Sequence, residues 1–209
     1  MPKALAMYWA RLEDNVHPDD KETFRQVSNH GFNLDFPPPA FIGDIVNAPV
    51  IILDNNGGYN AHITPAEFPD QEARNEFRKT LHTPQPVNPL ARSMSRYYLE
   101  RNYSRWLISG QAALVNGVAY RSLSGRERAV EQLTRILPSA IFHQKWLRDG
   151  LAPLAERRDR FVVVHRWGRW NRAANALRGK TATIFSTAPV RPDLTLAEFV
   201  AVQTFLGSR

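Results

Sequence analysis

Cysteine is absent from this chain of 209 residues, and lysine is scarce. Without cysteine there are no disulfides, thiolate metal sites, iron–sulfur clusters or cysteine nucleophiles. The six histidines are scattered and lack the spacing of metal ligands, so we expect neither a metal nor a cofactor. No apolar run is long enough to cross a bilayer, and the first residues lack the apolar segment of a signal peptide. We therefore expect a cytoplasmic protein with no membrane-spanning segment.

Only five of the 27 basic residues are lysines, which leaves 22 arginines, and the formal net charge is +7. Such an excess of positive charge favours an anionic partner. Arginine is suited to bidentate phosphate contacts and to stacking on bases. A GC-rich genome would also favour arginine codons, and many basic proteins bind nothing in particular. With both alternatives open, the composition favours single- or double-stranded DNA as the partner.

Four apolar segments predict strands, at residues 50–53, 112–120, 161–164 and 181–185. Helical spacing predicts the helices between and after them, at residues 65–80, 93–107, 124–137, 138–146, 169–177 and 195–206. Capping boxes at Ser124–Glu127 and Thr195–Glu198 open two of these helices. Strands that alternate with helices predict right-handed crossovers. We therefore expect an α/β fold, a three-layer α/β/α sandwich with a four-stranded mainly parallel sheet. It would form a single domain over residues 1–209, with residues 1–40 as an N-terminal arm.

Polar residues follow or interrupt each predicted strand. After the first strand come Asp54-Asn55-Asn56-Gly57-Gly58-Tyr59, and we expect the chain to leave the sheet there, because Gly-Gly is unfavourable in a strand. Asn116-Gly117 interrupts the second strand, His165–Gly168 follows the third, and Ser186–Pro189 follows the fourth. Because parallel strands end at one edge of a sheet, these residues are predicted to converge on one crevice.

In order and spacing, these segments resemble the motifs of the uracil-DNA glycosylase superfamily, over roughly residues 41–192. The family's first loop, GQDPY or GINPG, is similar to Asp54–Gly58, which places Asn56 on the water-positioning residue. Its LLLN-x-x-LTV strand is similar to Leu114–Tyr120, which places Asn116 on the residue that reads the base. Its LLWG strand end is similar to Val163–Gly168, and its HPSP or NPSG motif is similar to Ser186–Pro189. Three positions depart from the family pattern: Gly57 replaces a proline, Ser186 replaces His or Asn, and Gly58 lies where uracil-specific members carry a tyrosine.

The resemblance, together with the chemistry of base excision, suggests a role for each of these polar residues. Asn56 would orient the attacking water, Asp54 would serve as a general base, and His165 would stabilise the departing base. Side chains implied in base binding are Asn55, Tyr59 and Asn116. Those implied in DNA binding are Arg166, Arg169, Ser186, Thr187 and Arg191. Structural alternatives stay open: turn formation for Asp54 and Asn55, a satisfied buried amide for Asn116, and packing or hydrogen bonding for Tyr59 and His165.

These assignments predict a DNA glycosylase-like protein that hydrolyses the N-glycosidic bond of uracil or a related damaged base in DNA. The alternative is a non-catalytic nucleic-acid-binding protein of the same fold, favoured by the departures at Gly57 and Ser186. An enzyme acting on a free nucleoside or nucleotide is a third hypothesis. The positive charge and the absence of a glycine-rich phosphate-binding motif disfavour it.

Overall fold

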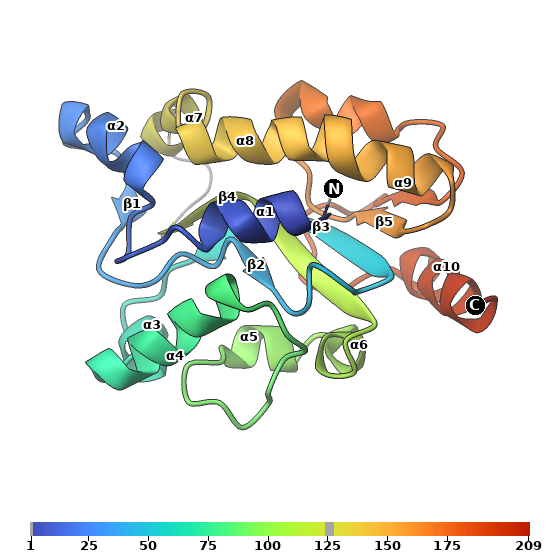
Figure 1. The fold of residues 1–209 in the computed structure, drawn as a ribbon, viewed down its shortest axis with the longest axis horizontal. Coiled ribbons are helices and arrows are strands. Elements are labelled where there is room, and N and C mark those ends of the chain that lie inside the picture. The colour runs from blue at the N-terminus through green and yellow to red at the C-terminus, as the bar shows by residue number, and fades with distance from the viewer. Residues whose placement is uncertain (1, 124–127) are drawn as a thin grey trace.

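The computed structural model describes residues 2–123 and 128–209. Within these residues a central sheet has the strand order β1-β4-β3-β5-β6, and β2 also pairs with β4 (Figure 1). The strands are β1 (Phe32–Asn33), β2 (Phe41–Ile42), β3 (Val50–Gly58), β4 (Ala112–Ser122), β5 (Phe161–Val164) and β6 (Thr183–Phe185).

The sheet is mostly parallel, which confirms the predicted α/β class. β3 pairs in parallel with β4 and β5, and β5 pairs in parallel with β6. These four strands are the predicted ones, and β5 has the predicted bounds. The predicted strand count is wrong, because the N-terminal arm adds β1 and β2 antiparallel to β4. Two-residue strands are too short to show a sequence period, so only their pairing identifies them.

Helices lie on both sides of the sheet ribbon in Figure 1, with α8 and α9 on one side and α3–α6 on the other. None of the helices in the described ranges combines the length and the apolar character needed to cross a membrane. The helices are α1 (Pro2–Trp9), η1 (Pro18–Asp20), α2 (Lys21–Gln26), α3 (Ile63–Glu67), α4 (Gln71–His82), α5 (Arg96–Leu99), α6 (Ser104–Ile108), α7 (Arg128–Thr134), α8 (Pro138–Trp146), η2 (Leu147–Leu151), α9 (Ala152–Glu156), η3 (Asn171–Leu177) and α10 (Leu196–Gly207).

Two predicted helices are each divided in two. The segment 65–80 is divided into α3 and α4. Asp70 is the N-cap of α4, and its side chain accepts a hydrogen bond from the Ala73 amide, so a new helix begins there. The segment 93–107 becomes α5 and α6, and Ser95 caps α5. The capping box of Thr195 and Glu198 at the start of α10 is confirmed, whereas Ser124–Glu127 lies outside the described residues.

β3 continues through the polar residues where a loop was predicted, so that prediction is wrong. Asp54 pairs with Asn116, Asn56 with Val118 and, after a register shift, Gly58 with Ser122. This parallel pairing with β4 overrides the low strand propensity of the sequence. Gly57 also fits a close approach, since a Cβ there would lie 2.3 Å from Pro39 Cγ.

β4 is likewise continuous through Asn116-Gly117, against prediction. The Asn116 amide N–H donates to the carbonyl of Ala40, so the arm supplies a backbone partner at this point. A Cβ on Gly117 would lie 3.2 Å from both the Arg169 backbone and Trp170 Nε1. The glycine therefore allows the segment after β5 to pack directly on β4.

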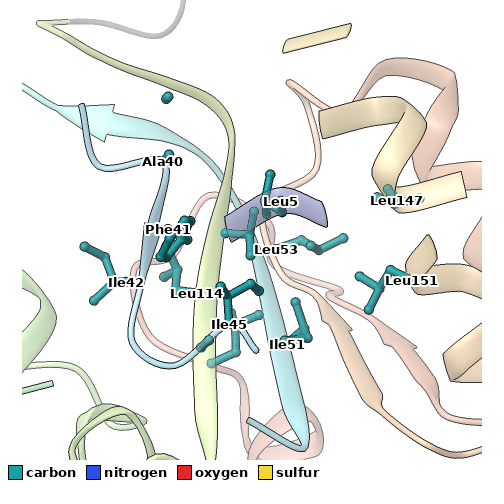
Figure 2. Close-up of a cluster of buried hydrophobic side chains, with 14 of the residues drawn as sticks. Leu5, Ala40, Phe41, Ile42, Ile45, Ile51, Leu53, Leu114, Leu147 and Leu151 are labelled. Carbon is teal, nitrogen blue, oxygen red and sulfur yellow. The ribbon is translucent and has the colours of Figure 1, made fainter. Parts of the chain in front are cut away.

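The apolar core joins the sheet to both the N-terminal arm and the later helices. Ile51 and Leu53 of β3 are fully buried, as are Leu5 of α1 and Leu147 and Leu151 of η2. Figure 2 shows Leu5 and Leu53 close together, with Leu147 and Leu151 further along the same cluster. The arm is thus part of the core.

A buried polar network fastens the arm to α8 and β4. The Asp20 carboxylate accepts hydrogen bonds from the Tyr120 hydroxyl and, at 2.9 Å, from the Ser139 amide. Trp9 Nε1 donates to His143 Nε2 at 2.7 Å, so His143 Nδ1 carries the proton donated to the Asn116 carbonyl. His143 is therefore held neutral, and burial lowers its pKa from 6.5 to about 4.

Gly57→Ala is expected to destabilise the fold, because the proline ring cannot yield as a flexible side chain would. We expect the free energy of unfolding to fall by about 1–3 kcal/mol. The lower midpoint of urea unfolding measures this change. Gly58→Ala is the matched control, since a Cβ there meets nothing within 4 Å. Equal midpoints for the two variants would show that Pro39 does not constrain β3.

His143 should make the protein sensitive to acid. Its folded-state pKa lies below the unfolded value, so its contribution to stability is complete above pH 6.5 and is lost as the pH falls towards about 4. The loss at pH 4 amounts to about 3 kcal/mol. Burial raises the pKa of Asp20, so the contribution of Asp20 to stability increases as the pH falls, opposite to that of His143.

The His143 contribution is therefore measured as the difference between wild type and His143→Gln in unfolding free energy across pH 4–7. The difference should narrow at acid pH. His62→Gln, at an exposed position, is the control and should parallel wild type. A difference that does not change with pH would contradict the neutral, buried His143.

Candidate functional site

The carboxyl ends of β3 and β5 form the topological switch point of the sheet. From β3 the chain crosses to β4 on one side and then to β5 on the other side. Pairing of β3 with β5 ends at Leu53 and Val164, whereas β3 remains paired with β4 as far as Gly58. Ligands of open α/β sheets bind where neighbouring strands lead in opposite directions. The residues just beyond Leu53 and Val164 are thus the candidate site.

Asp54 is the first residue of β3 beyond the end of β5. The residue is 3 % exposed, and Oδ1 accepts a hydrogen bond of 2.7 Å from the Asn55 amide. Burial raises the pKa of Asp54, although the nearby Arg166 cation and the Asn55 N–H group oppose the rise. The site therefore holds a carboxyl group that binds a proton more readily than an exposed aspartate.

Arg166 covers Asp54 through long contacts. Its Nη1 lies 3.5 Å from Asp54 Oδ1 and 3.4 Å from the Tyr97 hydroxyl, and Nη2 lies 3.4 Å from the Val190 carbonyl. Its Nε is buried without a hydrogen-bond partner. Three contacts near the upper distance limit hold this guanidinium less firmly than one bidentate phosphate pair would.

Asn55 lies on the opposite face of β3, because side chains alternate along a strand. Its Oδ1 accepts a hydrogen bond of 2.9 Å from the Arg169 amide. Trp170 Nε1 donates to the Asp54 carbonyl at 2.8 Å. These bonds tie the segment after β5 to β3, and they engage the Asn55 side chain on the face opposite the Asp54 carboxyl group.

Asn56 and Asn116 both have their amide groups engaged by the protein. Asn56 Nδ2 donates to the Ser122 hydroxyl at 2.8 Å and to the Gly57 carbonyl at 3.0 Å. Asn116 is 1 % exposed, and its Nδ2 donates to the Pro39 carbonyl. Their predicted roles in water positioning and base reading stay predictions.

His165 forms a buried pair with Glu198 at the start of α10. Its Nδ1 lies 3.1 Å from Glu198 Oε1, and its Nε2 is buried without a partner. Burial alone would raise the pKa of Glu198, but hydrogen bonds from His165 and Thr195 lower it. The ionised Glu198 accepts a hydrogen bond from the Nδ1–H group of His165, which leaves Nε2 as the nitrogen without a partner.

The remaining predicted residues lie at the rim or in packing positions. Tyr59 packs on Phe36 with ring centroids 6.2 Å apart. The Ser186 hydroxyl accepts a hydrogen bond from the Ala188 amide, which forms a turn before Arg191. Thr187 and Arg191 are exposed, as the predicted DNA contacts require.

A cavity of about 240 Å³ lies between the end of β3 and the helices α3 and α5. It is lined by Gly58, Tyr59, Asn60, Ile63, Thr64, Glu67, Ser95, Tyr97, Tyr98 and Arg121. Glu67, Tyr97 and Arg121 are not among the site residues predicted from the sequence. Arg121 carried a signal, because an arginine directly after the apolar run that ends at Tyr120 is unusual in a strand. In the described part of the chain, no group of three or more acidic or histidine side chains is arranged to hold a metal.

Comparisons with known protein families, with curated proteins and with solved structures found no match to this chain. The similarity of its motifs to the glycosylase superfamily therefore depends on the residues named above. The candidate site is defined by the contacts, distances and burial described above.

Asp54→Asn is expected to raise the stability of the folded protein at neutral pH. Because burial raises the folded-state pKa above 3.8, the ionised Asp54 opposes folding once the pH exceeds the unfolded value. The Asn55 hydrogen bond remains available to the amide oxygen. The gain in unfolding free energy should be largest at pH 7 and should diminish as the pH falls towards 4.

Asp149→Asn, at an exposed position, is the control and should show no such pH dependence. The measurement is urea unfolding from pH 4 to 7. A loss of stability at pH 7 for Asp54→Asn would mean that the contact with Arg166 outweighs the cost of burial.

Proposed function

We propose that this protein is a DNA glycosylase of the uracil-DNA glycosylase type, with the three-layer arrangement of that superfamily. The observation that carries the proposal is the buried Asp54 carboxyl group, with its raised pKa, at the switch point beside Arg166. An aromatic cavity lies on the same side of the sheet, lined in part by Tyr97 and Tyr98. Base excision requires both a group that activates water and a pocket for an extruded base.

In the proposed reaction the oxygen of a water attacks the sugar carbon that bears the base. Asp54 accepts a proton from this water, and the electron pair of the broken glycosidic bond leaves with the base. Asn56, two residues further along β3, would orient the water. Arg166 and His165 would stabilise the negative charge on the departing base.

Arg166 covers Asp54, so base excision requires its guanidinium to move. A DNA phosphate offers Arg166 a bidentate partner in place of its three long contacts. Binding of the backbone would then uncover the carboxylate for water. The net charge of +7, with Arg191 exposed at the rim, supports binding of a polyanion.

Oligonucleotides that carry uracil, a thymine mismatch or hypoxanthine test the proposal, with abasic product measured after alkaline cleavage. We expect Asp54→Asn to lower the rate by about 100-fold or more. The wild-type rate should rise with pH as Asp54 ionises. Asp149→Asn is the control and should retain the wild-type rate. Absence of product from every substrate would overturn the proposal.

The second candidate function is nucleic-acid binding without base excision. The 3 % exposure of Asp54 and the internal hydrogen bonds of Asn56 and Asn116 favour it. Binding to DNA that weakens steeply with added salt, with no abasic product, would distinguish it from the glycosylase.

A further inference from the structure

Glu67 is a buried carboxylate with unused hydrogen-bonding capacity at the wall of the aromatic cavity. It is 8 % exposed, and Oε2 has no hydrogen-bond partner. Arg121 Nη1 lies 4.0 Å from Oε2. Leaving a buried carboxylate oxygen without a partner is costly, which is typical of a position completed by a ligand.

Arg121 is 4 % exposed and is fixed by its surroundings. Its Nη1 donates to the Gly58 carbonyl at 3.2 Å, and its Nε donates to the Pro37 carbonyl at 3.3 Å. Its guanidinium also lies 5.2 Å from the centre of the Phe68 ring. The cavity wall therefore presents a hydrogen-bond acceptor and a cation side by side, at positions set by β4 and α3.

The other walls suit a flat ring. Tyr97 and Tyr98 pack edge to face with centroids 5.3 Å apart, and Tyr59 lies against Phe36. At Gly58 no side chain occupies the space, since a Cβ there meets nothing within 4 Å. A volume of about 240 Å³ is below the about 300–1,000 Å³ of cavities for drug-sized ligands. The cavity therefore suits a single planar ring system.

We propose that Glu67 and Arg121 bind the lactam edge of a heteroaromatic ring, in which a ring N–H lies beside a carbonyl oxygen. The N–H donates to Glu67 Oε2, and the carbonyl oxygen faces the Arg121 guanidinium. Uracil, thymine, guanine and hypoxanthine carry this edge. Adenine and cytosine present an unprotonated ring nitrogen instead, which would face the carboxylate with no proton between them.

That the ring belongs to a nucleobase in DNA rests on the proposed function, whereas the lactam edge rests on the cavity alone. Burial raises the pKa of the Glu67 carboxyl group, and the Arg121 guanidinium opposes this rise. Binding of the lactam N–H uses the ionised form of Glu67, which accepts hydrogen bonds and donates none. This carboxylate is separate from Asp54, so recognition and water activation are assigned to different acidic residues.

Binding of inosine, 1-methylinosine and adenosine to the wild-type protein tests the inference by calorimetry. Methylation removes the ring N–H with little other change, so we expect inosine to bind at least about tenfold more tightly than the other two. Single-stranded oligonucleotides with hypoxanthine, 1-methylhypoxanthine or adenine at one position form the second arm. Preference in both arms indicates that the ring alone is recognised, and preference in oligonucleotides alone indicates a nucleic-acid site.

Glu67→Gln should remove the preference for the N–H ring, because an amide can both donate and accept. Glu72→Gln, at an exposed position on α4, is the matched control and should retain the preference. If Glu67→Gln fails to fold, the comparison of methylated and unmethylated ligands on the wild-type protein still decides. Equal binding of inosine and 1-methylinosine, or no binding in either arm, would overturn the inference.

The outcomes also separate this inference from the proposed function. Preference for the N–H ring without release of any base would retain the lactam site and reject the glycosylase. Base release at equal rates from hypoxanthine and 1-methylhypoxanthine would reject the lactam site and retain the glycosylase.

Discussion

The unequal pairing of β3 on its two edges is the constraint on which the site depends. Over Val50–Leu53 the strand is held by both β4 and β5, and beyond Leu53 only β4 accompanies it. Because of this single-sided pairing, polar side chains lie in a buried environment, whereas in an ordinary loop they would be exposed to solvent. The altered acidity of Asp54 is a consequence of where β5 ends.

Most polar groups near the site are firmly bound, and this contrast identifies the groups that can respond to a ligand. Asn55, Asn56 and Asn116 each make a hydrogen bond of 3.0 Å or less to another part of the protein. The Arg166 guanidinium makes only longer contacts, and Glu67 Oε2 lies 4.0 Å from Arg121 Nη1 without a hydrogen bond. The candidate site thus combines a rigid frame with two unsatisfied charged groups, which is the arrangement that preorganised recognition requires.

Local pattern was sufficient for the parallel strands and the last helix, and insufficient where distant residues decide the outcome. β5 and the capping box at Thr195 have the bounds that their own residues predict. The strand character of Asp54–Gly58 depends on pairing with residues about sixty positions away, against local propensity. The partner of His165 and the pairing of Glu67 with Arg121 are also long-range, so no spacing in the sequence indicates them.

The position of β3 between β4 and β5 has a consequence for synthesis on the ribosome. Val50 is paired with Ala112 on one side and with Phe161 on the other. The N-terminal arm depends on Ser139 and His143, which are made more than a hundred residues after their partners Asp20 and Trp9. The edge of β3 that pairs with β5 therefore has no partner until about three quarters of the chain has been translated. Contacts of such sequence separation slow folding and leave an unpaired strand edge exposed to aggregation.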